Sequence, residues 1–352
     1  MRRLRNALTV LALATTLFSC LGCQFGYYLH SAYHQTKLIG SRQSLQKVLR
    51  GTHLSDAQKA KLRLVQEVKT FAESTLGLKA SRNYTSFVQI DGPYVTYIVQ
   101  AAHALELKPY LWKFPLIGDV PYKGYFKKSM ADDEASAFNA NEFDTYVRGV
   151  SAYSTLGWFE DSVLSTMLRY EDYELADVII HETVHTTLFI KSAAEFNERM
   201  ATFMGQEGMK LFYRSQGEAG AAALKKAEDD AHDRQLFSHF ITRENRDLKK
   251  WYEDNKGQVT TERKAARLKE LKDRYATELK PRFKGPGYRD FERRELNNAL
   301  LLAYQTYEHS LIDFEKLFQY FAGDFKKTLH YLKGLEKDPQ PDQTLKTFVS
   351  QK

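Results

Sequence analysis

Apolar residues recur at helical spacing over most of this chain. Between Tyr27 and about Leu76 they return every three or four residues, which predicts helices, at Leu38, Leu45, Val48, Leu49, Leu62, Leu64, Val65 and Val68. Ser55, with Gln58 three residues later, is a typical helix start. From Tyr173 onward the spacing is helical again. Residues 216–280 are highly charged and predict long exposed helices, with Gly257 as a turn between them.

The middle of the chain predicts strands instead. Residues 84–98 are rich in β-branched and aromatic side chains and are interrupted by the turn signal Asp91-Gly92-Pro93. Residues 109–126 carry repeated prolines and glycines, which predict an aromatic loop, and residues 146–150 predict another strand. A small sheet followed by many helices indicates an α+β fold that is predominantly α-helical.

The pattern also suggests a division of the chain. Residues 24–215 hold the predicted sheet and the chemical motifs described below, and residues 216–338 form a helical C-terminal region. A proline-containing segment, 281–287, separates the charged helices from a last helical block over 288–333. The tail, 339–352, is polar, and we expect it to be loose.

Residues 1–23 have the pattern of an export signal. Three arginines precede a twelve-residue apolar run, 7–18, and this run is too short to span a bilayer. The only two cysteines of the chain, Cys20 and Cys23, follow it in a context similar to the lipobox of bacterial lipoproteins. We expect Cys23 or Cys20 to carry a lipid that anchors the protein at the cell envelope, facing the periplasm or the exterior. An uncleaved anchor with incidental cysteines is the alternative.

The net charge of +7 raises the question of nucleic acid. Basic and acidic residues are mixed along the body of the chain, however, and no nucleic-acid recognition motif accompanies the charge. We therefore expect no nucleic-acid partner. The body beyond Cys23 has no cysteine, which excludes thiolate nucleophiles and thiolate ligands there.

The segment from His181 to His185 has the pattern H-E-x-x-H. Zinc binds imidazole nitrogens at about 2.0–2.1 Å, so two ligand nitrogens lie within roughly 4 Å of each other. Residues four apart share one face of an α-helix and meet this requirement, whereas on a strand they stand about 13 Å apart. His181 and His185 as zinc ligands therefore require a helix, although the neighbouring Val178, Ile179 and Ile180 favour strands.

Two carboxylates are candidates for a third ligand. Ser192 and Glu195 have the spacing of a capping box, which gives Glu195 a structural role at the start of a second helix. With the first helix ending near Ile190 and a short link between the two, the helices pack antiparallel. Helical rise then brings Glu198 level with His185. We therefore expect Glu198 to be the third ligand.

Several segments resemble a family of bacterial aminopeptidases of the gluzincin type, whose members often carry lipoprotein signals. These are residues 153–159, the motif at 181–185 and residues 196–203, with further similarity at 26–28, 123–126 and 297–304. The resemblance implies a zincin-like catalytic core, a zinc site and hydrolysis of peptide substrates. Thr183, Val184 and Thr186 depart from the residues expected around the motif, which leaves the ligands intact and puts substrate preference in doubt.

The residues then take distinct roles. His181, His185 and Glu198 leave one position of a zinc ion for water, as in catalytic sites, and Glu182 serves as the general base. Tyr153 is the expected oxyanion stabiliser, with Tyr304 as a second candidate and packing as the alternative for both. A structural or lost metal site remains open. So does a non-catalytic lipoprotein that keeps the fold as a scaffold or binding module.

Overall fold

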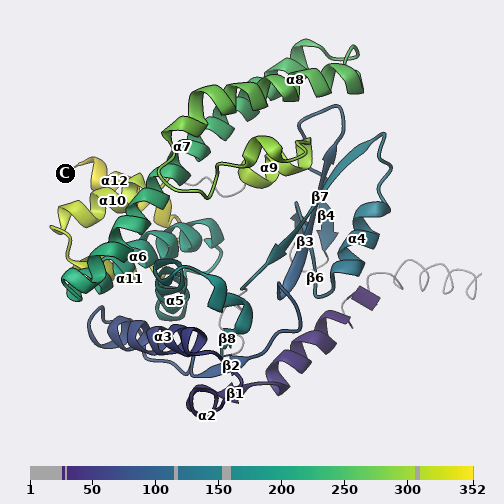
Figure 1. Ribbon diagram of the computed structural model, residues 1–352. Helices are drawn as coiled ribbons and strands as arrows, with labels where there is room; N and C mark the ends of the chain where they lie inside the picture. The colour runs from purple at the N-terminus through teal and green to yellow at the C-terminus, as the bar shows by residue number, and fades with distance from the viewer. Residues whose placement is uncertain (1–25, 28–29, 115–117, 153–159, 306–309, 352) are drawn as a thin grey trace, which may run out of the picture.

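A computed structural model describes residues 26–351 apart from 28–29, 115–117, 153–159 and 306–309. The predicted fold class is confirmed, because helices dominate and three small sheets of two or three strands accompany them. Figure 1 shows the sheets on one side of the helices α5 and α6, with a helical arm extending above both.

Helices open the described chain, as the sequence predicts. Residues 30–40 are helical, and α2 (Leu45–Arg50) and α3 (Asp56–Ser74) follow. Ser55 caps α3: its hydroxyl accepts from the backbone N–H of Gln58, whose side chain accepts from the backbone N–H of Ser55. The start predicted at Ser55 is thus confirmed, and its reciprocal bonds satisfy two N–H groups that a helix leaves unpaired.

The three sheets are assembled from short strands. One has the order β1-β2-β8, with β2 antiparallel to β1 and parallel to β8; the strands are Gln43–Ser44, Ser86–Val88 and Val163–Leu164. The antiparallel sheet β6-β3-β7 contains the two longest strands, and its bounds are Lys123–Tyr125, Thr96–His103 and Phe143–Val150. The third sheet pairs β4 (Trp112–Phe114) with β5 (Gly118–Val120). The aromatic loop predicted for 109–126 is therefore partly wrong, because three short strands lie within it.

Helices follow from residue 172 onward. In chain order they are α5 (Asp172–Thr187), α6 (Ala194–Ser215), α7 (Glu218–Asp254), α8 (Thr261–Arg274), α9 (Asn298–Gln305), α10 (Ile312–Tyr320), α11 (Phe325–Gly334) and α12 (Pro341–Ser350). A further helix, α4 (Lys128–Ser136), covers the sheet β6-β3-β7. Gly257 lies in the turn between α7 and α8 with a φ of 78°, which confirms the predicted turn.

Three hydrophobic clusters hold these elements together. The largest packs α5 and α6 against α3, the strands β2 and β8, and the helices α10 to α12. A second joins α7, α8 and α9, and a third lies between the sheet β6-β3-β7 and α4. Phe196 of α6 meets Phe314 of α10 with ring centroids 5.2 Å apart. The last helices thus share the core of α5 and α6.

Two predictions for the C-terminal region need correction. The tail expected to be loose after Pro339 forms the helix α12, which starts with Pro341 and buries Leu345 completely. Asp342 on this helix forms an ion pair with Arg199 on α6. The last helical block, predicted from residue 288, starts its first α-helix ten residues later, at Asn298. The buried contacts of α12, rather than its polar composition, explain its order.

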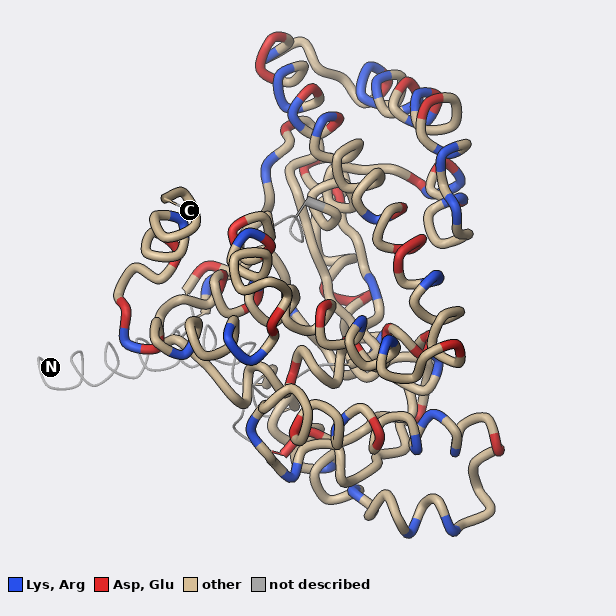
Figure 2. The backbone as a smooth tube through the Cα atoms, turned by 90° about the vertical axis from the view of Figure 1, so that its left-hand side faces the viewer, with Lys and Arg blue, Asp and Glu red and all other residues tan. Residues whose placement is uncertain are grey.

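Figure 2 shows Lys and Arg interleaved with Asp and Glu along the helices. Within the described part of the chain, no helix combines the length and the apolar character needed to cross a membrane.

Candidate metal centre

The helix α5 carries the H-E-x-x-H segment, as the metal interpretation requires. Ile179, Ile180 and Val184 are fully buried in the largest core cluster. Burial of this apolar face outweighs the modest strand preference of β-branched residues, because helix propensities differ by less than about 1 kcal/mol per residue. His181 and His185 lie on a different face of α5 from these buried residues. They share that face because they are four residues apart.

A short loop turns the chain from α5 into α6. Asn197, which is completely buried, closes this loop: its Oδ1 accepts from the N–H of Ile190 at 2.9 Å, and its Nδ2 donates to the C=O of Ile190 at 2.8 Å. The predicted capping box at Ser192 is wrong. Ser192 takes a left-handed conformation with a φ of 64°, and Ala193 occupies the N-cap position without a side-chain bond.

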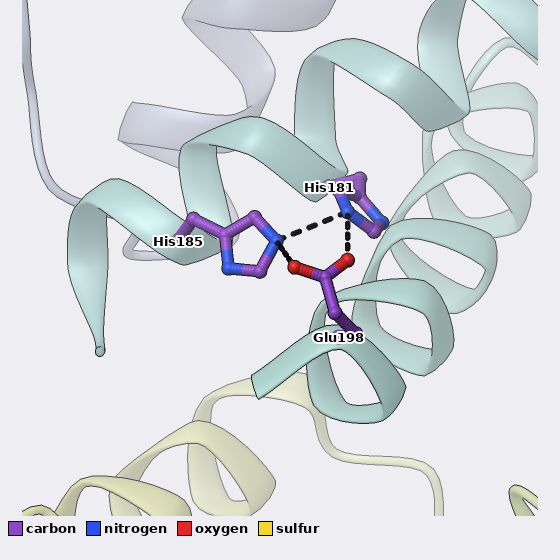
Figure 3. Close-up of side chains that lie close together, drawn as sticks. All are labelled: His181, His185 and Glu198. Atoms are coloured by element: carbon purple, nitrogen blue, oxygen red, sulfur yellow. Dashed lines mark hydrogen bonds and ion pairs between the residues drawn. The ribbon is translucent and has the colours of Figure 1, made fainter. Parts of the chain in front are cut away.

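The two helices bring three ligand groups together (Figure 3). The Nε2 atoms of His181 and His185 are 3.1 Å apart. Glu198 Oε2 lies 3.7 Å from the first nitrogen, and Glu198 Oε1 lies 3.4 Å from the second. One ligand atom from each residue lies within 4.8 Å of the others, and this is the one such group of three that the described residues form. The structure thus unites the three predicted ligands, and Glu195 is not among them.

The electrostatics of the cluster suit a cation. Hydrogen bonds from His181 and His185 hold the pKa of Glu198 far below its usual range, despite partial burial. Burial opposes protonation of His181, but Glu198, Glu182 and Asp177 together raise its pKa above the ordinary value. Two imidazole nitrogens and one carboxylate oxygen are also the donor set of many catalytic zinc sites. The cluster therefore fits such an ion, and the Glu198 side chain, 54% exposed, leaves an open side toward solvent.

Close helix packing supports the cluster from behind. A Cβ atom on Gly205 of α6 would stand 2.5 Å from Asp177 Oδ1 and 3.1 Å from His181 Cβ. A Cβ on Gly208 would stand 2.9 Å from Ile180. The absence of a side chain at these two glycines, on successive turns of α6, lets the two helices pack closely. This close packing influences the distance between the histidines and Glu198.

Sequence reasoning missed Asp177, Gly205 and Gly208. Asp177 lies one turn before His181 on α5, its Oδ1 is buried, and burial raises the pKa of this carboxyl to about 6. Its spacing of four from His181 was the available signal, since such residues share a helix face. For the glycines, the signal was their occurrence in the interior of a helix, where Gly weakens the helix unless close packing requires it.

The remaining predicted residues divide into two groups. Tyr153, the expected oxyanion stabiliser, lies outside the described residues. Tyr304 is on α9 and packs in the second core cluster, with ring centroids 5.0 Å from Phe237 and 5.8 Å from Phe291. Its position matches the packing alternative. Glu182 lies on α5 between the two histidines, and its charge contributes to the raised pKa values of His181 and the buried Tyr84.

Fold and site together define a helical α+β protein with a candidate metal centre in a helical hairpin. Residues 26–346 match the model of a family described as "Putative aminopeptidase". The chain belongs to this family, and the match covers nearly all of the described residues. No curated protein and no solved structure matches the chain.

Proposed function

We propose that the protein is a zinc-dependent peptidase, with aminopeptidase activity as its family's description suggests. The observation that carries the proposal is the convergence of His181, His185 and Glu198 on one point, with Glu182 on the same helix as the histidines. Two histidines and a glutamate are ligands of the gluzincin type, and they leave a coordination position open for water.

Each residue has a separate task in this proposal. His181, His185 and Glu198 hold the ion. When bound there, zinc polarises the scissile carbonyl and acidifies a water molecule. Glu182 accepts the proton of the attacking water and delivers it to the leaving amine, as a general base and then a general acid. Tyr153 is the proposed donor to the oxyanion.

The edge strand β7 is the proposed support for the peptide backbone. Among the described strands it pairs only with β3, and the edge of residues 146–150 that faces away from β3 is where we propose that an added strand binds. At its start, the side chain of Asn297 covers this edge by donating to the C=O of Thr145 at 3.0 Å. A peptide would therefore pair with the second half of β7.

We further propose that catalysis belongs to residues 24–215 within a zincin-like core, and that 216–338 serves as a supporting helical region. Residues 1–23 act as a lipoprotein signal, and Cys23 or Cys20 anchors the protein in the bacterial envelope. The support for this localisation is the sequence pattern alone.

The substitution Glu182→Gln tests the activity. Peptide libraries are incubated with the zinc-loaded protein, and new N-termini and released residues are identified by mass spectrometry. Glu182→Gln is expected to keep its zinc and lose about 10²- to 10⁴-fold in turnover, the usual contribution of general acid–base catalysis. Glu195→Gln, one turn of α6 before Glu198, is the matched control and should keep full activity. Equal turnover by Glu182→Gln and wild type contradicts the proposal.

A further inference from the structure

Two histidines outside the candidate metal centre repeat its imidazole geometry. His30 and His34 are four residues apart in the helical residues 30–40, and their Nε2 atoms lie 3.0 Å apart. The corresponding distance between His181 and His185 is 3.1 Å. Two nitrogens bound to one ion at about 2.0–2.1 Å, at square-planar to tetrahedral angles, stand about 2.8–3.4 Å apart. Both pairs have a spacing in this range.

The ring of His34 is held in place by aromatic neighbours. The ring of His34 stacks on Phe126, with centroids 5.4 Å apart and an interplanar angle of 17°, and meets the edge of Tyr33 at 5.3 Å. Phe126 follows β6, so this contact connects the N-terminal helix to the sheet β6-β3-β7. Packing of this kind fixes the ring before any ligand binds and lowers the entropy lost on binding.

Burial and nearby charges act on the pKa of His34 and on its affinity for a cation. Partial burial, then His30, Lys127 and Lys37, lower the pKa of His34. The imidazole is therefore neutral at neutral pH and offers a lone pair. Lys37 forms an ion pair with Asp91 at 3.7 Å, which reduces its repulsion of a cation, while Lys127 still opposes one.

We infer that His30 and His34 form a second metal site, which takes a divalent transition-metal ion through two imidazole nitrogens and leaves the other positions to water. Imidazole ligands suit copper, nickel and zinc, and among them Cu²⁺ binds most tightly. No carboxylate or third imidazole of the described residues joins this pair, so it binds more weakly than the centre at His181. The inference is independent of the proposed peptidase activity.

Copper binding to the full chain tests the inference. In a His181→Ala/His185→Ala background, which removes the first centre, one equivalent of Cu²⁺ is expected to bind, with electron paramagnetic resonance showing two nitrogen ligands. His34→Ala and His30→Ala should each weaken this binding by at least about tenfold. His330→Ala, which removes an exposed histidine on α11, is the matched control and should change nothing.

Two outcomes overturn the inference. One is Cu²⁺ binding that is equally tight in His34→Ala, and the other is a spectrum with a single nitrogen ligand. His34→Gln, which keeps a polar side chain in the helix, separates loss of a ligand from loss of structure. Its far-ultraviolet circular dichroism should match that of the background, and its copper affinity should fall as in His34→Ala.

Discussion

The side-chain amide of Asn197 forms two hydrogen bonds with the backbone of Ile190: its oxygen accepts from the N–H of Ile190, and its nitrogen donates to the C=O of Ile190. This pair fixes the loop that turns α5 into α6, and Glu198 is the next residue along the chain. The orientation of Glu198, the proposed third ligand, therefore depends on a side chain that is not itself one of the proposed ligands. Second-sphere groups of this kind commonly change metal affinity by 10- to 100-fold.

Replacement of Asn197 by Ala should loosen the site and the fold together. Two buried hydrogen bonds are lost, and the N–H of Ile190 remains unpaired while its C=O keeps the bond from Ala193 N–H, which costs about 1–3 kcal/mol of unfolding free energy. Zinc affinity should fall about 10- to 100-fold. Urea unfolding and competition with a chelator measure the two effects. Ser192→Gly, in the same loop, is the control: it relieves a left-handed conformation and should retain zinc affinity. Unchanged affinity in Asn197→Ala would contradict the positioning role.

Metal content should separate Glu198 from Glu195. The wild-type protein is expected to hold one equivalent of zinc after loading and dialysis, because three ligand groups converge. His181→Ala and Glu198→Ala remove a ligand and should lose the ion, whereas Glu195→Ala should keep it. Atomic absorption of the purified proteins provides the measurement. A wild-type chain that remains free of zinc at saturating concentration argues against the whole centre.

Zinc affinity should rise from pH 5.5 to pH 7.5. Zinc requires neutral imidazoles, and the raised pKa of His181 means that protons compete with the ion more strongly than at an ordinary histidine. Isothermal titration in buffers of different ionisation enthalpy reports the protons released. Glu198→Gln removes the carboxylate that favours the protonated ring, so it should flatten the pH dependence while weakening binding. A pH-independent affinity is incompatible with these ligands.

The metal-free protein should show a different pH profile. The pKa of His181 is raised, so its pairing stabilises the fold below about pH 6.5 and this contribution disappears as the pH rises through the folded value. The pKa of Glu198 is lowered, so its contribution is present above about pH 4.5 and disappears in stronger acid. Stability from the pair is therefore greatest between these two values. Urea unfolding of the apoprotein should show this maximum, and Glu198→Gln should lack it.

Gly205→Ala tests the close approach of the two helices. The added methyl group meets Asp177 and His181, so α6 has to move away, at a cost of about 1–3 kcal/mol. Zinc affinity should fall with it, because the movement separates Glu198 from the histidines. Gly334→Ala is the matched control. This glycine ends α11 with open space around it, and alanine there should be neutral or slightly stabilising. Thermal unfolding and chelator competition distinguish the two variants.

The site was predictable where the chemistry imposed its own geometry. Zinc spacing required a helix at His181 to His185 against local strand preference, and helical rise selected Glu198 over Glu195; the structure places both as expected. The capping box at Ser192 failed because another local contact, between Asn197 and Ile190, determines the loop. The buried amide of Asn197 fixes the loop and shifts the N-cap to Ala193.

The C-terminal helix was unpredictable for a different reason. Residues 341–350 are mostly polar, and short helices of such composition are marginal in water. Their order comes from Leu345 in the core and from the ion pair between Asp342 and Arg199, partners that are distant in sequence. Gly205 is a partial case: its place in a helix interior indicates close packing, but the sequence does not show that Asp177 is the residue it packs against.

The hairpin of α5 and α6 has a consequence for how the proposed centre would take up a metal ion. All three proposed ligands lie within residues 181–198, so the chain segment that must close to unite them is short. Loop-closure entropy is correspondingly small, and the contacts that build the centre have low contact order. A complete coordination set is present as soon as two neighbouring helices have docked, before the strands β3 and β7, some forty residues apart in sequence, need to pair. Metal binding at the proposed centre would then not require β3 and β7 to have paired.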